Sequence, residues 1–522
     1  MTEQTPAGVV SPPDGPEPRA EELRDRLAAF LRHHLGVPEV VVDPPEQIQG
    51  GASRLSYRVR YRAGDDPVVH AVLRMVPESG GFTTEGAEYE AVVIEALAGS
   101  GVPVPEILCR SEDPAWLGAP FMLMVEVRNC SSDAALLFEP RFAEVREQIG
   151  RTFWEALGRL AALDPVRLGL AEAAGLPDAD QAWRLELDFV NECLAAGGAQ
   201  NHPLGRYLLL WLEENPPPPS GKVAIVHGDF RPGNFLFDES GAVRAVLDWE
   251  RWRLGDPVID LAYSLRPTWR SKDGETLIPE ADAIAAWERT SGLTLDPRAR
   301  AWFEVADRAA ALGTLAQMQA QYIADGGHEN TIYFFVLRSL SASWPRLREL
   351  VGLPEPTIAP RVAPETQPSK DGGEGLGAYV ALLGERIGRD IAPAMPTPHA
   401  RANTALDTRI LRVVADRLEN GVDILASDNT EVAAVLEAAL ATAPEAAREA
   451  GADLVLRQAP ASLRTSALQR RNDELWAVCV RLLDRVHRGA TSEDREVRAR
   501  IEQALSNHYE RLVLPLATFT TP

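Results

Sequence analysis

Residues 226–250 decide the fold and read VHGDFRPGNFLFDESGAVRAVLDWE. One histidine, three aspartates and one asparagine stand between short apolar runs that are typical of buried strands. Asn234 lies five positions after Asp229, and Asp248 closes the hairpin that follows. This spacing fits metal-assisted phosphoryl transfer, in which one aspartate accepts the proton of a hydroxyl while an asparagine and a second aspartate hold Mg²⁺. We therefore predict that Asp229 is catalytic and that Asn234 and Asp248 are metal ligands.

The motifs around this stretch are specific in combination. HGDFRPGN and LDWE are followed directly by RWRLGDPVIDLAY at residues 251–263. Together they resemble the aminoglycoside phosphotransferase and choline kinase-like superfamily over roughly residues 38–350. The resemblance implies a bilobal protein kinase-like fold that binds ATP and Mg²⁺. The alternative is that Asp229 and Asn234 merely cap turns, as such residues often do.

A nucleotide-binding region is expected before this stretch. Gly50, Gly51 and Ser53 in QGGASR resemble the short phosphate loop of the family, because glycines let the backbone approach phosphates. The cation that holds the phosphates is expected on a strand, where this chain has Arg74 in AVLRMV and no lysine before Lys222. GGAS followed by LR is similar to the acyl-CoA dehydrogenase-associated branch of the superfamily.

The resemblance also implies an acidic partner and a hinge. In a kinase-like fold the cation pairs with a helix glutamate, and Glu90 is our prediction, with Glu88 as second choice. Main-chain groups near Glu126 and Val127, in FMLMVEVRN, are expected to meet adenine.

The order of predicted elements gives an α+β fold class. Strands, a helix and two further strands over about ninety residues indicate a small β-rich N-lobe, and mainly helical patterns follow. After a segment rich in proline and glycine, alanine, leucine and arginine recur at helical spacing, which predicts a C-terminal all-α domain. The predicted parts are a disordered leader at 1–19, an N-lobe at 20–127, a helical C-lobe at 128–351, a linker at 352–375 and a helical accessory domain at 376–522.

Composition and charge argue against some classes of binding partner. The net charge is −23, which argues against nucleic acid. From residue 370 onward there are 19 basic and 22 acidic residues, so almost all of the negative charge lies in the first 369 residues. No run approaches the roughly 20 apolar residues of a membrane helix, and the acidic, proline-rich start is unlike a secretion signal. A cytoplasmic protein with no membrane partner is expected.

The acceptor is predicted only as the hydroxyl of a small metabolite. Arginines in RWR and RPTWR, near Asp248, suit a carboxylate or phosphate, as in a hydroxy acid or a hydroxyacyl-CoA. An aminoglycoside-like compound calls instead for carboxylates, and these arginines could equally pair with surface acids.

Two other functions stay open. One is a kinase acting on a protein hydroxyl, although no long activation segment separates LDWE from GDPVID. The other is a non-catalytic nucleotide-binding scaffold, which Arg74 in place of lysine favours. For the C-terminal helices we favour a homodimer contact or the docking of a partner.

Overall fold

The computed structural model has two compact units, which we name the sheet unit and the helical unit. The sheet unit comprises residues 1–132, 168–173 and 234–252, and the helical unit comprises residues 133–167, 174–233 and 253–522. The structure describes residues 20–48, 54–76, 86–132, 137–200, 202–266, 269, 276–324, 330–359, 376–395, 398–458, 462–489 and 491–514. Within these ranges, no helix is long and apolar enough to cross a lipid bilayer.

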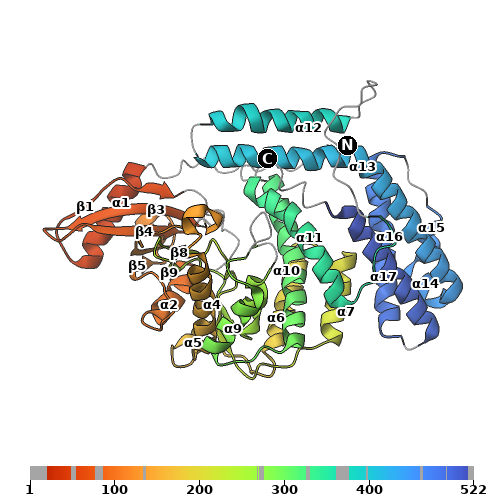
Figure 1. Cartoon of the computed structure of the whole chain (residues 1–522), viewed down its shortest axis with the longest axis horizontal. Helices are drawn as coiled ribbons and strands as arrows, with labels where there is room; N and C mark the ends of the chain where they lie inside the picture. The colour runs from red at the N-terminus through yellow and green to blue at the C-terminus, as the bar shows by residue number, and fades with distance from the viewer. Residues whose placement is uncertain are drawn as a thin grey trace, which may run out of the picture. The chain divides into compact units, whose positions relative to one another are not determined.

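A six-stranded antiparallel sheet forms the centre of the sheet unit (Figure 1). Its order is β1-β3-β4-β6-β5, and β2 also pairs with β3. The strands are β1 (Val40–Val42), β2 (Glu46–Ile48), β3 (Leu55–Ala63), β4 (Val69–Met75), β5 (Ile107–Ser111) and β6 (Phe121–Val125). The helices are α1 (Ala20–Leu35), α2 (Ala87–Leu97) and α3 (Pro114–Leu117). The expected α+β class with a β-rich N-lobe is therefore confirmed.

Side chains alternate along each strand, so the two faces of this sheet carry different residues. In β3, buried Tyr57 and Val59 alternate with exposed Arg58 and Arg60. The buried face packs on α1 through one continuous apolar cluster that includes Leu23, Leu27, Phe30, Leu31, Leu73 and Leu123. The opposite face carries Arg74 and is the face that positions the site.

A hairpin from the middle of the chain completes the sheet unit. Its strands are β8 (Phe235–Phe237) and β9 (Val243–Val246), and Asp238 closes the turn by accepting hydrogen bonds from the N–H groups of Ser240 and Ala242. The N–H of Val246 donates to Pro103 O at 2.8 Å, and Ser131 pairs with Phe237. The second half of the 226–250 stretch thereby joins the sheet unit.

The helical unit is built from a lobe and a C-terminal helical region. The two short strands β7 (Ala224–Val226) and β10 (Arg253–Gly255) pair antiparallel in the lobe. The lobe's helices are α4 (Arg146–Ala162), α6 (Ala182–Ala196), α7 (Pro203–Glu214), α8 (Val258–Ser264), α9 (Glu280–Ser291), α10 (Pro297–Ala324) and α11 (Asn330–Val351). The short helix α5 (Leu170–Ala174) belongs to the sheet unit except for its last residue. Helix α4 packs against α9, and α10 packs against α6, α7, α8 and α11.

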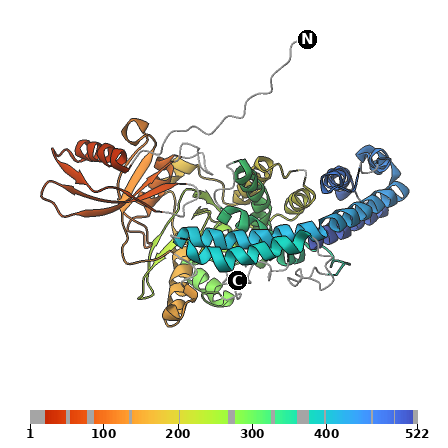
Figure 2. The ribbon, with the colours of Figure 1, turned by 90° about the horizontal axis from the view of Figure 1, so that it is seen from above.

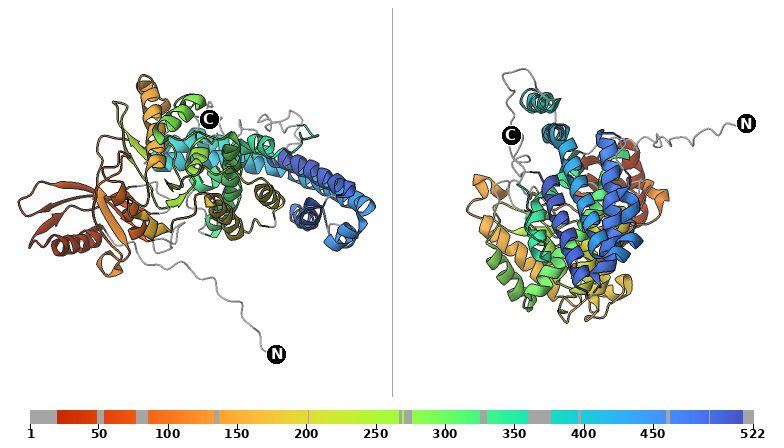
Figure 3. Two further views of the ribbon diagram at one scale, coloured as in Figure 1. Left: turned by 90° about the horizontal axis from the view of Figure 1, so that it is seen from below. Right: turned by 90° about the vertical axis from the view of Figure 1, so that its right-hand side faces the viewer.

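The C-terminal region of the helical unit is all-helical, as expected. Its helices are α12 (Leu376–Arg386), α13 (Pro398–Thr442), α14 (Pro444–Ala450), α15 (Ala452–Leu456), α16 (Thr465–His487) and α17 (Ser492–Leu512). Figure 2 shows α12 running alongside α13, and Figure 3 shows α16 and α17 packed along α13. The predicted domain boundaries stay predictions, because the leader at 1–19 and most of the linker, residues 360–375, lie outside the described residues.

Candidate active site

The loop that carries the predicted base is held from below by α8. It follows β7 and turns sharply at Gly228 and Gly233, whose φ angles of 81° and 108° favour glycine. The buried Asp260 carboxylate of α8 accepts hydrogen bonds from the N–H groups of His227 at 2.6 Å and Gly228 at 2.9 Å. The Ser264 hydroxyl is 2.5 Å from Phe230 O. Asp260 therefore fixes the loop through its backbone.

Asp229 sits at the tip of this loop with its carboxylate oriented by two neighbours. The hydroxyl of Tyr263 donates to Oδ1, and Arg231 Nε donates to the same oxygen at 3.1 Å. The Arg231 guanidinium lies over the ring of Trp269, 5.3 Å from its centroid. The sequence analysis missed Arg231 and Tyr263 as site residues, although both lie inside the motifs, two positions after Asp229 and at the end of DLAY.

Arg74 is the centre of a charged cluster in the sheet unit. Its Nη2 donates to Asp248 Oδ1 at 2.8 Å, and its Nη1 is 3.0 Å from Glu90 Oε1. The second-choice partner, Glu88, instead binds Arg110. Burial raises the pKa of Glu90 to about 7, and nearby Asp248 adds to the rise, while Arg74 opposes it. The structure thus brings together three residues that the sequence analysis singled out.

A second ion pair borders this cluster and was missed from the sequence. Arg54 Nε lies 3.6 Å from Glu250 Oε2, and both side chains are buried. Arg54 directly follows Ser53 of the predicted phosphate loop, and Glu250 ends the LDWE motif. The pair therefore ties the end of that loop to the predicted metal segment. Gly50, Gly51 and Ser53 themselves lie outside the described residues.

The hairpin brings the two predicted metal ligands to one end. The N–H of Leu247 donates to Asn234 O at 2.7 Å, so Asp248 follows directly on a residue bonded to Asn234. Asp248 has a left-handed φ of 68°, a strained conformation for a non-glycine residue and one often found at functional sites.

Asn234 and Asp248 suit a Mg²⁺ ion that takes its remaining ligands from water and substrate, rather than a metal site built from protein side chains alone. Among the described residues, no group of three or more His, Cys, Asp or Glu could hold a metal by itself. One carboxylate and one amide oxygen suit Mg²⁺, which keeps several waters and is usually completed by substrate phosphates.

The predicted hinge follows β6. The N–H of Glu126 donates to His70 O at 3.0 Å, and the Glu126 carboxylate accepts from Arg58 Nε at 2.7 Å. Val127 lies one residue beyond. Met122 is the direct register partner of Arg74, and Met124 pairs with Val72, so both methionines lie on the face that carries Arg74.

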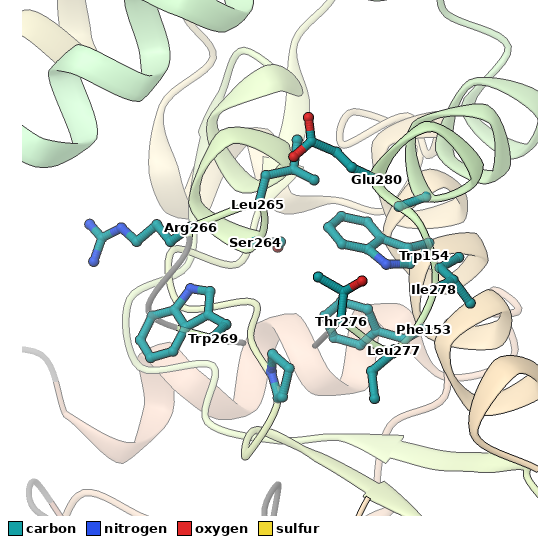
Figure 4. Close-up of a pocket in the computed structure, with 12 residues that line it drawn as sticks. Phe153, Trp154, Ser264, Leu265, Arg266, Trp269, Thr276, Leu277, Ile278 and Glu280 are labelled. Atoms are coloured by element: carbon teal, nitrogen blue, oxygen red, sulfur yellow. The ribbon is translucent and has the colours of Figure 1, made fainter. Parts of the chain in front are cut away.

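A pocket in the helical unit adjoins the Asp229 loop (Figure 4). Its cavity volume is about 50 Å³, and the pocket is partly open to solvent. Its walls are mainly apolar and aromatic, and the lining includes Phe153, Trp154, Pro232, Ser264, Trp269 and Ile278. Such a lining is typical of small-molecule sites.

Two of the arginines that suggested an anionic acceptor are already paired with acids. Arg266 forms a two-pronged ion pair with Asp307, and Figure 4 shows its guanidinium directed away from Phe153 and Trp154. Arg253 Nη2 donates to Glu186 at 2.6 Å. For these two residues the alternative interpretation holds, and they give no support to an anionic acceptor. Arg270 lies outside the described residues.

Comparison with known proteins shows what the chain is similar to. Residues 45–293, just under half of the chain, match the phosphotransferase enzyme family. The chain is 31% identical over 249 residues to mouse acyl-CoA dehydrogenase family member 10, and 33% identical over 178 residues to the chicken family member 11. These alignments cover 46% and 33% of the chain but only 22% of each relative, so the chain spans about a fifth of their length.

The resemblance to the aminoglycoside phosphotransferase superfamily and its acyl-CoA dehydrogenase-associated branch is thereby confirmed. Among solved structures, a Ralstonia eutropha protein assigned as an aminoglycoside phosphotransferase matches with 21% identity and a TM-score of 0.48. That match covers 63% of this chain and 95% of the other.

Proposed function

We propose that this chain is an ATP- and Mg²⁺-dependent O-phosphotransferase that acts on a hydroxyl of a small metabolite. The observation that carries the proposal is the contact of Arg74 with both Glu90 and Asp248 on one face of the sheet. A cation paired to a helix glutamate, next to a metal-binding aspartate, is the arrangement that phosphoryl transfer uses.

Arg74 is proposed to bind the nucleotide phosphates. Its planar guanidinium presents paired N–H donors that match phosphate oxygens, which the point charge of lysine cannot do. Gly50, Gly51 and Ser53 are proposed to bind the phosphates as well, and Asn234 and Asp248 to hold Mg²⁺. When bound, the ion neutralises charge on the phosphate oxygens.

Asp229 is proposed to act as the base. As the acceptor oxygen bonds to the γ-phosphorus and ADP leaves, Asp229 takes the proton of the acceptor hydroxyl. Tyr263 and Arg231 support this role by holding the carboxylate in one orientation. A base must be pre-positioned, because small misplacements lower the rate strongly.

The acceptor is proposed to be a hydroxy acid or a hydroxyacyl-CoA, with aminoglycoside-like compounds as the comparison class. The aromatic pocket beside Pro232 and Ser264 suits an apolar chain better than a polycation. The relatives' names join this family of domain to acyl-CoA dehydrogenases, which supports testing acyl thioesters first.

The test has a binding arm and a transfer arm. ATP with Mg²⁺ should raise the melting temperature, and the Asp248→Ala variant should lose the part of that rise that depends on Mg²⁺. A phosphate-transfer screen over hydroxyacyl-CoAs, hydroxy acids and aminoglycosides then identifies the acceptor. An unchanged Mg²⁺ effect in Asp248→Ala would remove the metal role, and ATP binding without transfer to any hydroxyl would favour the scaffold.

A further inference from the structure

Helix α12 exposes large apolar side chains that a helix normally buries. Its sequence, LGAYVALLGER, has no charged residue before Glu385. Leu376 is 69% exposed, Tyr379 60% and Leu383 50%. A helix that is apolar nearly all round is usually covered on every side. On α12, one side is covered by α13, and the large side chains named above are exposed with respect to the described residues.

The inner side of α12 is made of small residues. A Cβ added to Gly377 would lie 2.6 Å from Ala415 O of α13, and one added to Gly384 would lie 3.2 Å from Thr408 O. Ala381, between them, is buried. Helix α12 therefore approaches the backbone of α13 closely through its smallest residues and directs its leucines elsewhere.

Helix α13 continues the exposed surface. Val414 is 40% exposed and Leu418 is 48% exposed. The two helices are antiparallel, because Gly377 meets Ala415 while the later Gly384 meets the earlier Thr408.

The place of a residue in the sequence, relative to the residues at the α12–α13 contact, determines the side of the helical hairpin on which it lies. Leu376 and Leu383 each precede a contact glycine of α12, and Val414 precedes contact residue Ala415. Leu418 likewise precedes Glu419, whose Cβ faces Gly377. In an antiparallel pair, the positions just before the contact residues lie on the same side of both helices. We call Leu376, Leu383, Val414 and Leu418 the hairpin face.

We infer that a second copy of this chain covers the hairpin face, joining two α12–α13 hairpins around a two-fold axis. The hairpin face exposes four large apolar side chains from two adjacent helices, and a contiguous exposed apolar patch is a mark of an interaction surface. An uncharged apolar surface is complementary to itself, as an isologous contact requires.

Charge favours the same contact. Of the net charge of −23, the part from residue 370 onward carries close to −3, with 19 basic and 22 acidic residues. Two copies repel each other least when they meet through this nearly neutral region. The rim of α12 carries both signs, at Arg386, Arg389 and Asp390, so a two-fold copy brings no block of like charge together.

The test measures the mass of the full chain by light scattering after size-exclusion chromatography and by sedimentation. We expect wild type to be a dimer at micromolar concentration. The double variant Leu383→Glu/Leu418→Glu should weaken the dimer by at least about 100-fold, because like charges would face one another. The matched control is Leu454→Glu, which changes a leucine that is 63% exposed on α15, away from the hairpin face, and should stay dimeric.

Two results would overturn the inference. One is a monomeric wild type at tens of micromolar, which would mean that another occupant covers the face. The other is a double variant that stays dimeric while Leu454→Glu behaves like wild type. The far-UV spectrum of each variant shows whether it is folded, and the single variants Leu383→Glu and Leu418→Glu replace the double variant if it is not. Activity is not a readout here, so failure of the inference leaves the proposed function untouched.

Discussion

The sheet unit and the C-terminal helices both bury carboxylates, and they differ in how those carboxylates are hydrogen-bonded. In the C-terminal helices, Asp428 of α13 is 2% exposed. It accepts hydrogen bonds from Asn472 at 2.6 Å, Trp476 at 2.9 Å, His508 at 2.8 Å and Arg511 at 2.9 Å. Although burial alone would raise it, the pKa of Asp428 is lowered to about 2, chiefly through His508.

Glu90 in the sheet unit is equally buried but incompletely paired. It is 1% exposed, and neither of its carboxylate oxygens accepts a hydrogen bond from a described residue, its contact with Arg74 being an ion pair only. Its pKa is raised to about 7. The Nε of Arg74 is likewise buried without a hydrogen-bond acceptor in the described part of the chain.

The difference separates a structural cluster from a binding cluster. Buried polar groups in native proteins are nearly always hydrogen-bonded, and exceptions gather at functional sites. The Asp428 cluster has its partners within the fold and serves to fix α13, α16 and α17. In the Arg74 cluster, Glu90 and the Nε of Arg74 lack hydrogen-bond partners among the described residues. We interpret this cluster as a binding site for a charged ligand.

The largest expected effect separates activity from stability. Asp229→Asn should lower the transfer rate by about 10²–10⁴-fold, because the base is lost. The side-chain shape remains, so the melting temperature and ATP affinity should stay near those of wild type. Steady-state rates and calorimetry on the same preparation check this. Wild-type turnover of a confirmed acceptor would show that Asp229 is not the base.

In the C-terminal helices we expect the opposite result, a loss of stability without a loss of ATP binding. Asp428→Ala should lower the free energy of unfolding by about 3–5 kcal/mol, because buried partners such as His508 and Trp476 lose the carboxylate that they bind. The affinity for ATP of the folded protein should not change. Urea unfolding followed by circular dichroism measures the loss, with exposed Asp423→Ala on the same helix as the control. A shift no larger than that of the control would mean that the cluster is not structural.

The two clusters should also respond to pH with opposite sign. The folded-state pKa of Glu90 is above its ordinary value of 4.5, so its contribution is complete below pH 4.5 and is lost as the pH rises toward 7. The loss is at most about 3 kcal/mol. Asp428, with a lowered pKa, contributes above pH 3.8 and loses its contribution as the pH falls toward 2.

Glu90→Gln tests the first of these directions. The variant should lack the fall in stability between pH 4.5 and 7 that wild type shows, since glutamine does not titrate. Glu88→Gln, on the same helix but exposed, is the control and should keep the wild-type profile. Identical profiles for wild type and Glu90→Gln would contradict the assignment of this titration to Glu90.

Most of the sheet unit could be predicted from alternation and helical spacing. The expected order of strands, a helix and two further strands agrees with β3, β4, α2, β5 and β6. The short strands β1 and β2 could not be predicted, because three residues carry too little periodicity. Nor could the joining of β8 and β9 to the sheet unit, since it depends on contacts with Pro103 and Ser131 far away in sequence.

The candidate site also contains residues that could be predicted from the sequence and residues that could not. Residues inside motifs, such as Asp248 and Arg74, could be nominated because their spacing is local. Their contact joins positions 174 residues apart, and only the fold reveals it. Arg54 and Glu250 were missed because a buried ion pair leaves no local pattern. Conversely, RWR and RPTWR suggested an anion site, but sequence cannot show that Arg253 and Arg266 are paired with Glu186 and Asp307.

The central claim is that the incompletely paired cluster around Arg74 binds nucleotide phosphates. Isothermal titration of ATP and of adenosine into wild type, Arg74→Ala and Arg74→Lys tests it directly. Arg74→Ala should weaken ATP binding by about one to two decades, the value of a charge-assisted contact of about 1.5–3 kcal/mol. Adenosine, which lacks phosphates, should bind equally to wild type and to Arg74→Ala. Arg74→Lys should recover part of the ATP affinity. Equal weakening of ATP and adenosine by Arg74→Ala would contradict the claim and make Arg74 a structural residue.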